Sequence, residues 1–396
     1  MPDTMLAALL TAPGRIEIRA VPAPEPGAGE VLLRPAAVGL CGTDFHIHAG
    51  EANYHADAAG RPVPLERSPQ ILGHEITAIV DRLGPGACGS LRAGDRVLVD
   101  QGRSCSSRGA ARFCEYCETG DLHQCEQYAE HGITGLPGAL AERMAVPAVN
   151  CIRIEGEIPL EQAVLAEPLA CVLHNLEAMS RARTRYAVGG VGGGRRAETI
   201  WIAGAGPAGL LFIQALRNVM RFDGFLITTD PDPAKRARAL AAGASAALDP
   251  AADLPAIAAA LTRGKLAEIL IDACGAGSLF TLAPGLLRKQ GTFLLYGHGH
   301  GGTGLEALNT LQFRETAFVT ACGASGGHDA DGRPAVYRRA LELLQSRRIE
   351  VSDIITHRAM GLEEVPAAFS GTHRESGYVK AVVHLEPHRQ ATGEVR

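Results

Sequence analysis

The sequence is poor in aromatic side chains, in blocks of one charge and in long apolar runs. Phe, Trp and Tyr make up 5% of the 396 residues, so Ala, Val, Leu and Gly must fill most of the core. The formal net charge is −5 without a Lys/Arg block, which argues against nucleic acids and anionic membranes as partners. No stretch reaches the roughly 20 consecutive apolar residues that a membrane-spanning helix needs.

A secretory signal is also missing from its expected place. The apolar run 5–10 is short, no basic residue precedes it, and Pro13 and Gly14 mark a turn after it. We therefore expect a cytoplasmic protein. Its ten cysteines would then bind metal or be inert core thiols instead of forming a disulfide framework.

Two domains are expected, because single cores stop growing near ~250–300 residues. The first part of the chain has short Val/Leu/Ile runs between Gly and Pro turns, which is typical of an all-β, barrel-like module. From about residue 170, buried-strand patterns alternate with helical patterns, which indicates an α/β domain with a doubly wound parallel sheet. The strands of this sheet are expected at 199–203, 225–229, 268–272 and 291–296, and its helices at 210–219 and 233–242.

The end of the chain is expected to return to the first domain. An amphipathic helix at 335–346 is followed by short strands that end with 378–384. The expected division is a first domain at 1–168, a dinucleotide-binding domain at 169–320 and a returning segment at 321–396.

A glycine motif marks the expected dinucleotide site, directly after the strand at 199–203 and at the start of a helix. The first glycine allows a tight turn, the second lets the backbone approach a pyrophosphate, and the third lets helix and strand pack closely. Free N–H groups at the helix start would bind the phosphates. The motif consists of Gly204, Gly206, Pro207, Ala208 and Gly209. The glycine-rich stretch at 188–194 follows no apolar strand and precedes no helix, so we interpret it as a flexible surface loop.

The cofactor is expected to be NAD. Asp230 ends the second strand, where an acidic residue holds the ribose hydroxyls and repels the extra phosphate of NADP. No Arg or Lys follows before Lys235. Asp232 could replace Asp230, and Asp230 could instead cap the next helix. By their positions after later strands, Ala273 and Gly297 are further expected cofactor contacts.

Cys41, His74 and Glu167 are candidates for a catalytic zinc site. Alone, each would be an ordinary core or surface residue. Beside a dinucleotide fold, they match the three protein ligands of a catalytic zinc, which keeps one position open. A thiolate and a carboxylate would balance the charge of Zn²⁺, and Glu75 could enter the coordination shell. We expect Cys41 in a loop after one strand, and His74 and Glu75 at the start of another.

Four further cysteines lie within 21 residues in a segment of Gly, Ser and charged residues. A cysteine has no obvious hydrophobic role in such a segment, so we expect a closed, tetrahedral structural zinc site in a lobe at 100–130. Buried inert thiols are the alternative. The four are Cys105, Cys114, Cys117 and Cys125.

Together these residues resemble the zinc-containing medium-chain dehydrogenase/reductase (alcohol dehydrogenase) family, and in particular its polyol/sorbitol and threonine dehydrogenase branch. The resemblance covers nearly the whole chain and implies a GroES-like β-barrel catalytic domain interrupted by a Rossmann domain, with the active site between them. It is carried by Leu-Thr-Ala-Pro-Gly at 10–14, Cys-Gly-Thr-Asp at 41–44, Gly-His-Glu at 73–75, Ala-Gly-Asp-Arg-Val at 93–97, the cysteine lobe, Gly-Leu-Pro-Gly at 135–138, Glu-Pro-Leu at 167–169 and the glycine motif.

The resemblance also implies roles for single residues. It places Thr43 and His46 in a proton relay and gives Asp44 the task of orienting a zinc-bound histidine. A glutamate at 167, where alcohol dehydrogenases of the family carry cysteine, favours the polyol branch. The implied zinc ligands are Cys41, His74 and Glu167, with Glu75 as an exchangeable ligand.

Two segments depart from the family pattern. The first gap of the cysteine lobe, usually two residues, here spans 106–113. A longer loop costs only about 0.6 kcal/mol of closure entropy per doubling, so we still expect zinc there. The segment 51–68 is longer and more polar than the family pattern, and it either shapes the substrate pocket or is a solvated loop.

The expected reaction is hydride transfer to NAD from a secondary alcohol of a polar substrate, such as a sugar, polyol, cyclitol or hydroxy-amino acid. The alternatives are a zinc-free, NADPH-dependent reductase of the same architecture and a non-catalytic zinc- and NAD-binding protein. By family analogy we expect a homodimer or homotetramer whose partner is a small-molecule alcohol.

Overall fold

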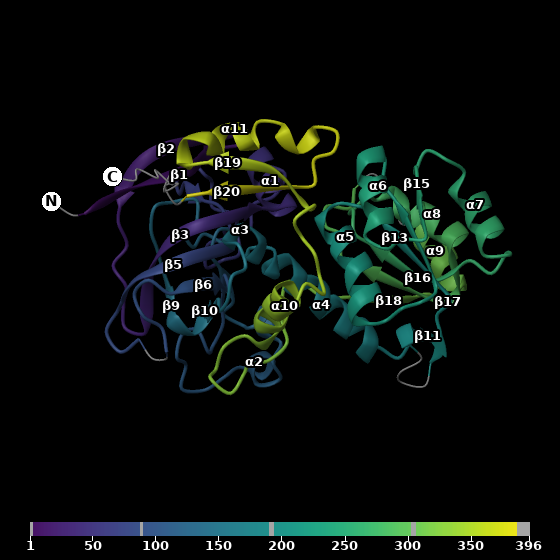
Figure 1. Cartoon of the computed structure of the whole chain (residues 1–396), viewed down its shortest axis with the longest axis horizontal. Coiled ribbons are helices and arrows are strands. Elements are labelled where there is room, and N and C mark those ends of the chain that lie inside the picture. The colour runs from purple at the N-terminus through teal and green to yellow at the C-terminus, as the bar shows by residue number, and fades with distance from the viewer. Residues whose placement is uncertain (1–2, 88–89, 190–193, 302–305, 386–396) are drawn as a thin grey trace, which may run out of the picture.

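The computed structural model describes residues 3–87, 90–189, 194–301 and 306–385, which form two lobes joined by helices α4 and α10 (Figure 1). The bounds of the joining helices are Ala166–Arg181 for α4 and Ala335–Gln345 for α10. In the described ranges, no helix is both long and apolar enough to cross a bilayer.

The first lobe is built mainly of short strands. They are β1 Thr4–Ala12, β2 Arg15–Pro22, β3 Glu30–Leu40, β4 Gln70–Ile71, β5 Glu75–Leu83, β6 Arg96–Val99, β7 Gly102–Arg103, β8 Ala129–Glu130, β9 Met144–Pro147, β10 Cys151–Arg153, β19 Ile355–Met360 and β20 Lys380–His384. Its helical segments are α1 Gly42–Ala49, α2 Glu115–Glu118, α3 Leu160–Ala163, α11 Val365–Phe369 and the 3₁₀ turns Leu122–Gln124, Ala148–Asn150, Leu362–Glu364 and Thr372–Arg374.

The main sheet of this lobe combines strands from the first part of the chain with β19 and β20 from its last part, whereas β1, β2 and β4 form a separate sheet. Its order is β10-β6-β5-β3-β20-β19, with β9 also paired to β3. Strand β20 lies antiparallel to β3, so the returning segment packs beside the N-terminal strands (Figure 1). One hydrophobic cluster accordingly joins Val31 and Ile76 with Phe369 and Val383. In the structure, β20 of the late segment thus belongs to the same sheet as β3 of the first lobe.

The second lobe is a six-stranded parallel sheet between helices. Its strands are β13 Thr199–Ala203, β14 Phe225–Thr229, β15 Ala246–Leu248, β16 Ala267–Asp272, β17 Leu287–Leu295 and β18 Ala317–Thr320, with a small separate pair β11 Tyr186–Ala187 and β12 Arg195–Arg196. Its helices are α5 Pro207–Gln214, which continues as a π-helical turn over Ala215–Val219, α6 Pro233–Ala241, α7 Leu254–Leu261, α8 Ser278–Leu286 and α9 Glu306–Phe313.

Side chains of β13 alternate between the two faces of the parallel sheet. Ile200 and Ile202 share a cluster with residues of α5, whereas Trp201 and Ala203 pack with residues of α7 and α8. Successive side chains of β13 point to opposite faces of the sheet, and both faces are covered by apolar residues. The strand is therefore hydrophobic at nearly every position. The sheet order is β15-β14-β13-β16-β17-β18, so the direction of winding reverses beside β13. Ligands of such sheets bind outside the carboxyl ends of the strands at this point.

The predicted fold class is confirmed, but the loop expected around Cys41 is wrong. Helix α1 begins at Gly42 directly after Cys41, and the Asp44 carboxylate accepts a hydrogen bond from the Cys41 N–H at 2.9 Å. Gly50, with φ of +76°, ends the helix. This local capping makes a helix out of a segment without a clear apolar period. The loop expected at 188–194 lies largely outside the described residues.

Replacing Phe212 by Ala should lower the free energy of unfolding of the second lobe by about 3–5 kcal/mol, because the ring is fully buried and its loss leaves a cavity. Trp201, the one tryptophan of the chain, is buried in the same lobe, so its emission during urea titration measures the effect. Leu240, which is 49% exposed, provides the control. Leu240→Ala should change the free energy of unfolding by less than about 0.5 kcal/mol. An unchanged transition in Phe212→Ala would contradict this description of the core.

Candidate active site

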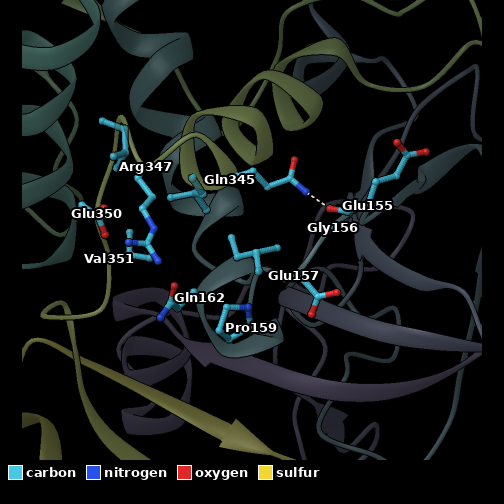
Figure 2. Close-up of a pocket in the computed structure, with 12 residues that line it drawn as sticks. Glu155, Gly156, Glu157, Pro159, Gln162, Gln345, Arg347, Glu350 and Val351 are labelled. Carbon is cyan, nitrogen blue, oxygen red and sulfur yellow. Dashed lines mark hydrogen bonds between the residues drawn. The ribbon is translucent and has the colours of Figure 1, made fainter.

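A cleft of about 1250 Å³ lies between the lobes and collects the residues expected at the site. Its walls come from α1, the start of β5, the first turns of α4 and α5, the loops after β16 and β17, and the returning segment. A second cavity of about 480 Å³ lies between residues 155–162 and the end of α10 (Figure 2). The second cavity lacks both the cysteine and histidine donors and the glycine motif, so the cleft is the candidate active site.

Three potential metal ligands meet in the cleft. Ligand atoms of Cys41, His74 and Glu75 all lie within 4.8 Å of one another. Zinc bonds to sulfur, nitrogen and oxygen are about 2.0–2.3 Å long, so atoms that share one ion lie at most roughly 4.6 Å apart. The cluster therefore has the size and the donor chemistry of a zinc site.

Asp44 joins the two segments that carry these donors. Its Oδ2 accepts from the Cys41 N–H at 2.9 Å, and its Oδ1 accepts from the Gly73 N–H at 3.3 Å. The same Oδ1 lies 3.3 Å from Nδ1 of His74, which leaves Nε2 as the nitrogen available to a metal. Asp44 itself is fully buried. The structure thus places Asp44 where the resemblance expects it.

Asp44 and His74 shift each other's pKa in opposite directions. Burial would raise the pKa of Asp44, but the neighbouring imidazole and the two backbone N–H groups outweigh burial and lower it. Burial would lower the pKa of His74, but Asp44 and the Cys41 thiol outweigh burial and raise it well above its usual value. The pair therefore favours a positive charge beside the thiol, at the place where the metal would lie.

Glu75 is fixed by a buried lysine that the sequence did not identify. Lys380, in β20, donates to Oε1 of Glu75, and both side chains are at most 2% exposed. Burial opposes the charge on Lys380, but Glu75 outweighs burial and raises the pKa of the amine. Oε2 of Glu75 is buried and has no hydrogen-bond partner within the described residues. This atom needs a further partner, and a cation supplies one.

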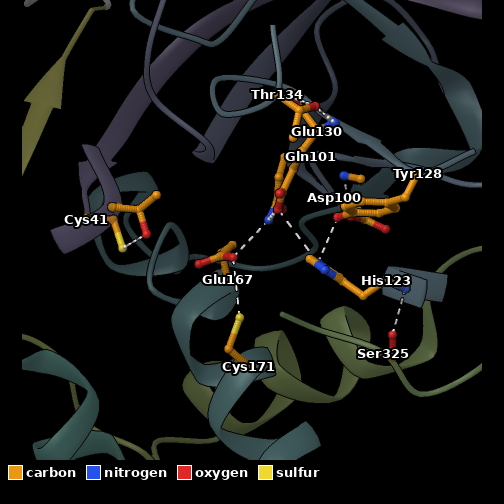
Figure 3. Close-up of polar contacts among 12 residues, drawn as sticks. Cys41, Asp100, Gln101, His123, Tyr128, Glu130, Thr134, Glu167, Cys171 and Ser325 are labelled. Carbon is orange, nitrogen blue, oxygen red and sulfur yellow. Dashed lines mark hydrogen bonds and ion pairs between the residues drawn. The ribbon is translucent and has the colours of Figure 1, made fainter. Parts of the chain in front are cut away.

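Glu167 lies in the same cleft but outside the 4.8 Å cluster. It stands in the first turn of α4, and its Oε1 accepts from Gln101 Nε2 at 3.0 Å and from the Cys171 thiol at 3.5 Å (Figure 3). Burial, followed by the negative charge of Glu75, raises the pKa of Glu167 to about 7. A nearby cation would stabilise the ionised form of this carboxylate, as a bound metal does for its ligands.

Thr43 and His46 lie at the mouth of the cleft, on α1. The Thr43 hydroxyl is 3.9 Å from Cys41 Sγ, and Nδ1 of His46 is 2.7 Å from a carboxylate oxygen of Glu51. The His46 side chain is 42% exposed, so it reaches both the cleft and solvent. Thr43 and His46 therefore both line the cleft, and Glu51 is an additional partner of His46.

The segment 51–68 combines both roles that were considered for it. Its base faces the cleft, where the Tyr54 hydroxyl lies 2.7 Å from His298 Nε2 of the second lobe. Its tip is exposed and is closed by a hydrogen bond between Arg61 and Asp57. The base shapes the pocket and the tip is a solvated loop.

The glycine motif opens toward the cleft, and its backbone explains the choice of residues. Gly204 has a φ of +103°, and a Cβ on Gly209 would lie 2.0 Å from the Gly204 carbonyl oxygen. A Cβ on Gly206 would meet nothing within 4 Å, so the space in front of it is open. Pro207 and Ala208 line the cleft at the start of α5. This arrangement can accept a pyrophosphate at the helix start.

Asp230 lies beside the glycine motif and does not cap the next helix. Its Oδ2 accepts from the Ala205 N–H at 2.9 Å. Asp232 caps α6 instead, and its carboxylate also accepts from the Gly377 N–H at 2.5 Å. Asp230, and not Asp232, is therefore the carboxylate beside the glycine motif, where the ribose is expected. The Asp232 carboxylate is bound to the start of α6 and to Gly377.

The two later cofactor positions also lie in the cleft. Ala273 and Gly297 follow β16 and β17, and a Cβ on Gly297 would lie 2.2 Å from the Gly275 nitrogen. Between them, the buried Asp272 accepts from the Gly275 N–H and lies 2.5 Å from His300 Nε2. The loops after both strands are therefore tightly packed against each other at the floor of the cleft.

The four cysteines of the lobe at 100–130 form a second cluster. Their sulfur atoms lie within 4.8 Å of one another, and none of the four forms a disulfide. N–H groups of Glu126 and Cys117 lower the pKa of Cys114 to about 6, which favours the thiolate that zinc binds. Four sulfur donors at this spacing suit a tetrahedral zinc site.

The widened gap of this lobe contributes a cation to the cluster. Arg108, which lies in the gap, approaches Cys125 Sγ to 3.3 Å and Cys105 Sγ to 4.0 Å. Ser106 and His328 join the gap to the returning segment through a contact of 2.9 Å. The extra residues thus pack around the sulfur atoms and leave the four-cysteine cluster intact.

Comparisons with known proteins agree with this geometry. The alcohol dehydrogenase GroES-like domain model matches residues 27–156, and the zinc-binding dehydrogenase model matches residues 207–346. L-threonine 3-dehydrogenase from Pyrococcus horikoshii is 30% identical over 371 residues, which are 93% of this chain and 95% of that protein. The chain belongs to the zinc-type medium-chain alcohol dehydrogenase family. It is accordingly an oxidoreductase that acts on alcohols with zinc and a nicotinamide cofactor.

Other members of the family differ in what their names say they act on. Erythritol/L-threitol dehydrogenase from Mycolicibacterium smegmatis is 28% identical over 90% of this chain and 91% of that protein. A solved structure described as a zinc-binding dehydrogenase from Sinorhizobium meliloti, bound to NADP, is 27% identical with a TM-score of 0.74. It covers 96% of this chain and 99% of that one. The names of these relatives thus refer to different substrates, and the solved structure among them contains NADP.

Loss of one lobe cysteine should remove one zinc ion from this dehydrogenase. Cys117→Ser takes away a buried sulfur donor, so zinc analysis of the purified protein should find about one ion fewer per chain and a lower melting temperature. Cys322, which is exposed and outside both clusters, is the control: Cys322→Ser should keep the full zinc content. An equal zinc content in Cys117→Ser and wild type would show that the lobe holds no metal.

Proposed function

We propose that this dehydrogenase transfers a hydride from a secondary alcohol of a polar substrate to NAD. The zinc would be bound by Cys41, His74 and Glu167, and Glu75 would serve as an exchangeable ligand. The observation that carries the proposal is the donor cluster of Cys41, His74 and Glu75 at one end of the cleft that also holds the glycine motif. The same cluster argues against a zinc-free reductase of this architecture.

Zinc bound there would act as a Lewis acid that makes the substrate hydroxyl more acidic. The residues of the chain then have to move one proton and exclude water. Thr43, beside Cys41, can accept a hydrogen bond from the substrate hydroxyl, and His46 can take up the proton. Glu51, at 2.7 Å from His46, orients the imidazole. Because His46 is partly exposed, the proton can leave to solvent.

Polar side chains around the cleft support a substrate with several hydroxyl groups. Tyr54, Glu130 and His298 line the cleft together with the donor cluster. Hydrogen-bonding groups of this kind can orient a substrate that carries several hydroxyl groups. The names of similar proteins refer to threonine, to erythritol and threitol and to sorbitol, all of which carry a secondary alcohol and further polar groups.

NAD as the cofactor is supported by the charges around the expected ribose position. The Asp230 carboxylate is negative and lies at the base of the glycine motif. Arg236 is the nearest arginine along the chain, but it is paired with Asp249 and with the Asp230 and Pro231 carbonyl groups. A phosphate on the ribose would therefore meet the Asp230 carboxylate and an arginine that is already engaged, and Lys235 of the cleft wall is the nearest cation along the chain.

We further propose a homo-oligomer in the cytoplasm. Strand β18 is the free edge of the parallel sheet, and Phe318 on it is 44% exposed. Phe313, at the end of the preceding helix, is 89% exposed. An apolar sheet edge of this kind suits pairing with a second copy. A four-cysteine cluster without disulfides suits a reducing compartment.

Substitution at the donor cluster tests the proposed chemistry. Cys41→Ser or His74→Ala should reduce turnover by roughly a thousandfold or more, because a metal supplies several kcal/mol of charge stabilisation. NADH binding, followed by fluorescence, should change by less than about twofold. The assay is NAD reduction with a panel of sugars, polyols, cyclitols and threonine. Full turnover in either variant, or in metal-free protein, would refute the proposal.

Asp230→Asn tests the cofactor. It keeps the shape of the side chain but removes its charge, so kcat/KM with NAD should fall by about tenfold to a hundredfold and the preference over NADP should shrink. Asp253→Asn, at the cap of α7, should leave the ratio of the two cofactors unchanged. A wild-type protein that prefers NADP would contradict the assignment of NAD.

A further inference from the structure

Gln101 is a buried glutamine that forms hydrogen bonds with side chains of three other elements. Figure 3 labels two of its partners, Glu130 and Glu167. Gln101 follows β6 and is 1% exposed. Its Nε2 donates to Glu167 Oε1 at 3.0 Å and to Glu130 Oε1 at 3.1 Å. Its Oε1 accepts from the Tyr337 hydroxyl at 2.6 Å. Both N–H groups and the carbonyl oxygen of the amide are therefore used.

These contacts determine which way the amide points. A half-turn of the amide would aim Oε1 of Gln101 at two carboxylates, and oxygen atoms without a proton between them repel each other. The half-turn would also leave the Tyr337 hydroxyl facing an NH₂ group. Only the observed orientation satisfies all three partners, so Glu167 meets a donor at a fixed position.

The donors on Glu167 all meet one of its two carboxylate oxygens. Gln101 and the Cys171 thiol both contact Oε1, and neither contacts Oε2. An amide and a thiol carry no positive charge, so they fix the carboxylate without neutralising it. Oε2 of Glu167 thereby stays available to a cation in the cleft.

The network also reaches both helices that join the lobes. Tyr337 is fully buried in α10, and α10 packs along α4, which carries Glu167 in its first turn (Figure 1). Gln101 thus ties a segment of the first lobe to both helices at the level of the donor cluster. A change in the packing of these helices would move Glu167 through this contact.

We propose that Gln101 is a positioning residue that holds Glu167 as a ligand of the catalytic zinc, and that Tyr337 supports it from α10. The proposal rests on the proposed function, because it requires zinc at Cys41, His74 and Glu167. Gln101 itself does not line the cleft and reaches it through Glu167 and Glu130, of which only Glu167 is a proposed zinc ligand. Contacts of this kind typically change metal affinity by about 10–100-fold.

The test is the zinc affinity of the catalytic site in full-length protein, measured by competition with a chelator. Zinc bound at the four-cysteine cluster, whose side chains form no hydrogen bond with Gln101, would serve as an internal reference. Gln101→Ala should weaken the catalytic site by about 10–100-fold and leave the reference unchanged. Gln101→Glu, which keeps the shape but places a third carboxylate against two others, should weaken it at least as much. Tyr337→Phe should have a smaller effect in the same direction.

Gln214 provides a matched control. It is also a buried glutamine, and it bonds the backbone of Glu350 through both ends of its amide, at 2.7 Å each. Gln214→Ala should lower stability but keep the zinc affinity. Replacement of zinc by cobalt gives a second readout, because the visible bands of cobalt should shift in the Gln101 variants and not in Gln214→Ala.

The outcomes separate this inference from the proposed function. A wild-type protein that binds zinc in the cleft and turns over, together with Gln101 variants of unchanged zinc affinity and cobalt spectrum, would overturn the inference alone. A wild-type protein without zinc in the cleft would overturn both. If Gln101→Ala and Gln101→Glu fail to fold, Tyr337→Phe decides the question, and an unchanged zinc affinity in it overturns the inference.

Discussion

Buried negative charge on one wall of the cleft is the constraint on which the rest of the structure depends. Glu75 and Glu167 are 0% and 5% exposed, and the Cys41 thiol lies beside them. Ionised groups away from water are stable only next to opposite charge. Lys380 and His74 provide part of that charge, and a divalent metal between the thiol, the imidazole and the carboxylates would provide the rest. Strands β5 and β20 carry Glu75 and Lys380, α4 carries Glu167, and Cys41 directly precedes α1, so four elements bring these groups to one cleft.

The two lobes divide the chemistry between them. The β-rich first lobe holds the metal donors on short segments whose backbone is fixed by Asp44, and the parallel sheet of the second lobe opens its glycine motif toward the same cleft. Strand order reverses beside β13, so the cofactor site is set by topology before any side chain is considered. The candidate metal donors and the glycine motif therefore lie along the same cleft, because the chain leaves the first lobe through α4 and returns to it after β18.

Short sequence patterns predicted much of this arrangement, but they did not predict contacts between residues far apart in the chain. The strand at 199–203, the glycine motif and the four lobe cysteines are each readable from a few neighbouring residues. The loop expected after Cys41 is a helix, because the cap by Asp44 outweighs a weak apolar period. Lys380 pairs with Glu75 across 305 positions of sequence, and Gln101 meets Glu167 across 66. A lysine within an apolar strand indicates a buried charge. The residues around Lys380 in the sequence do not indicate that its partner is Glu75.

A crystal structure of the zinc-loaded protein with NADH, recorded at the zinc absorption edge, tests the central claim most directly. The account predicts an anomalous peak about 2.0–2.3 Å from Cys41 Sγ, a His74 nitrogen and a carboxylate oxygen of Glu167, with the nicotinamide ring facing it. A structure without a peak among these three residues, or with NADH bound away from them, would contradict it.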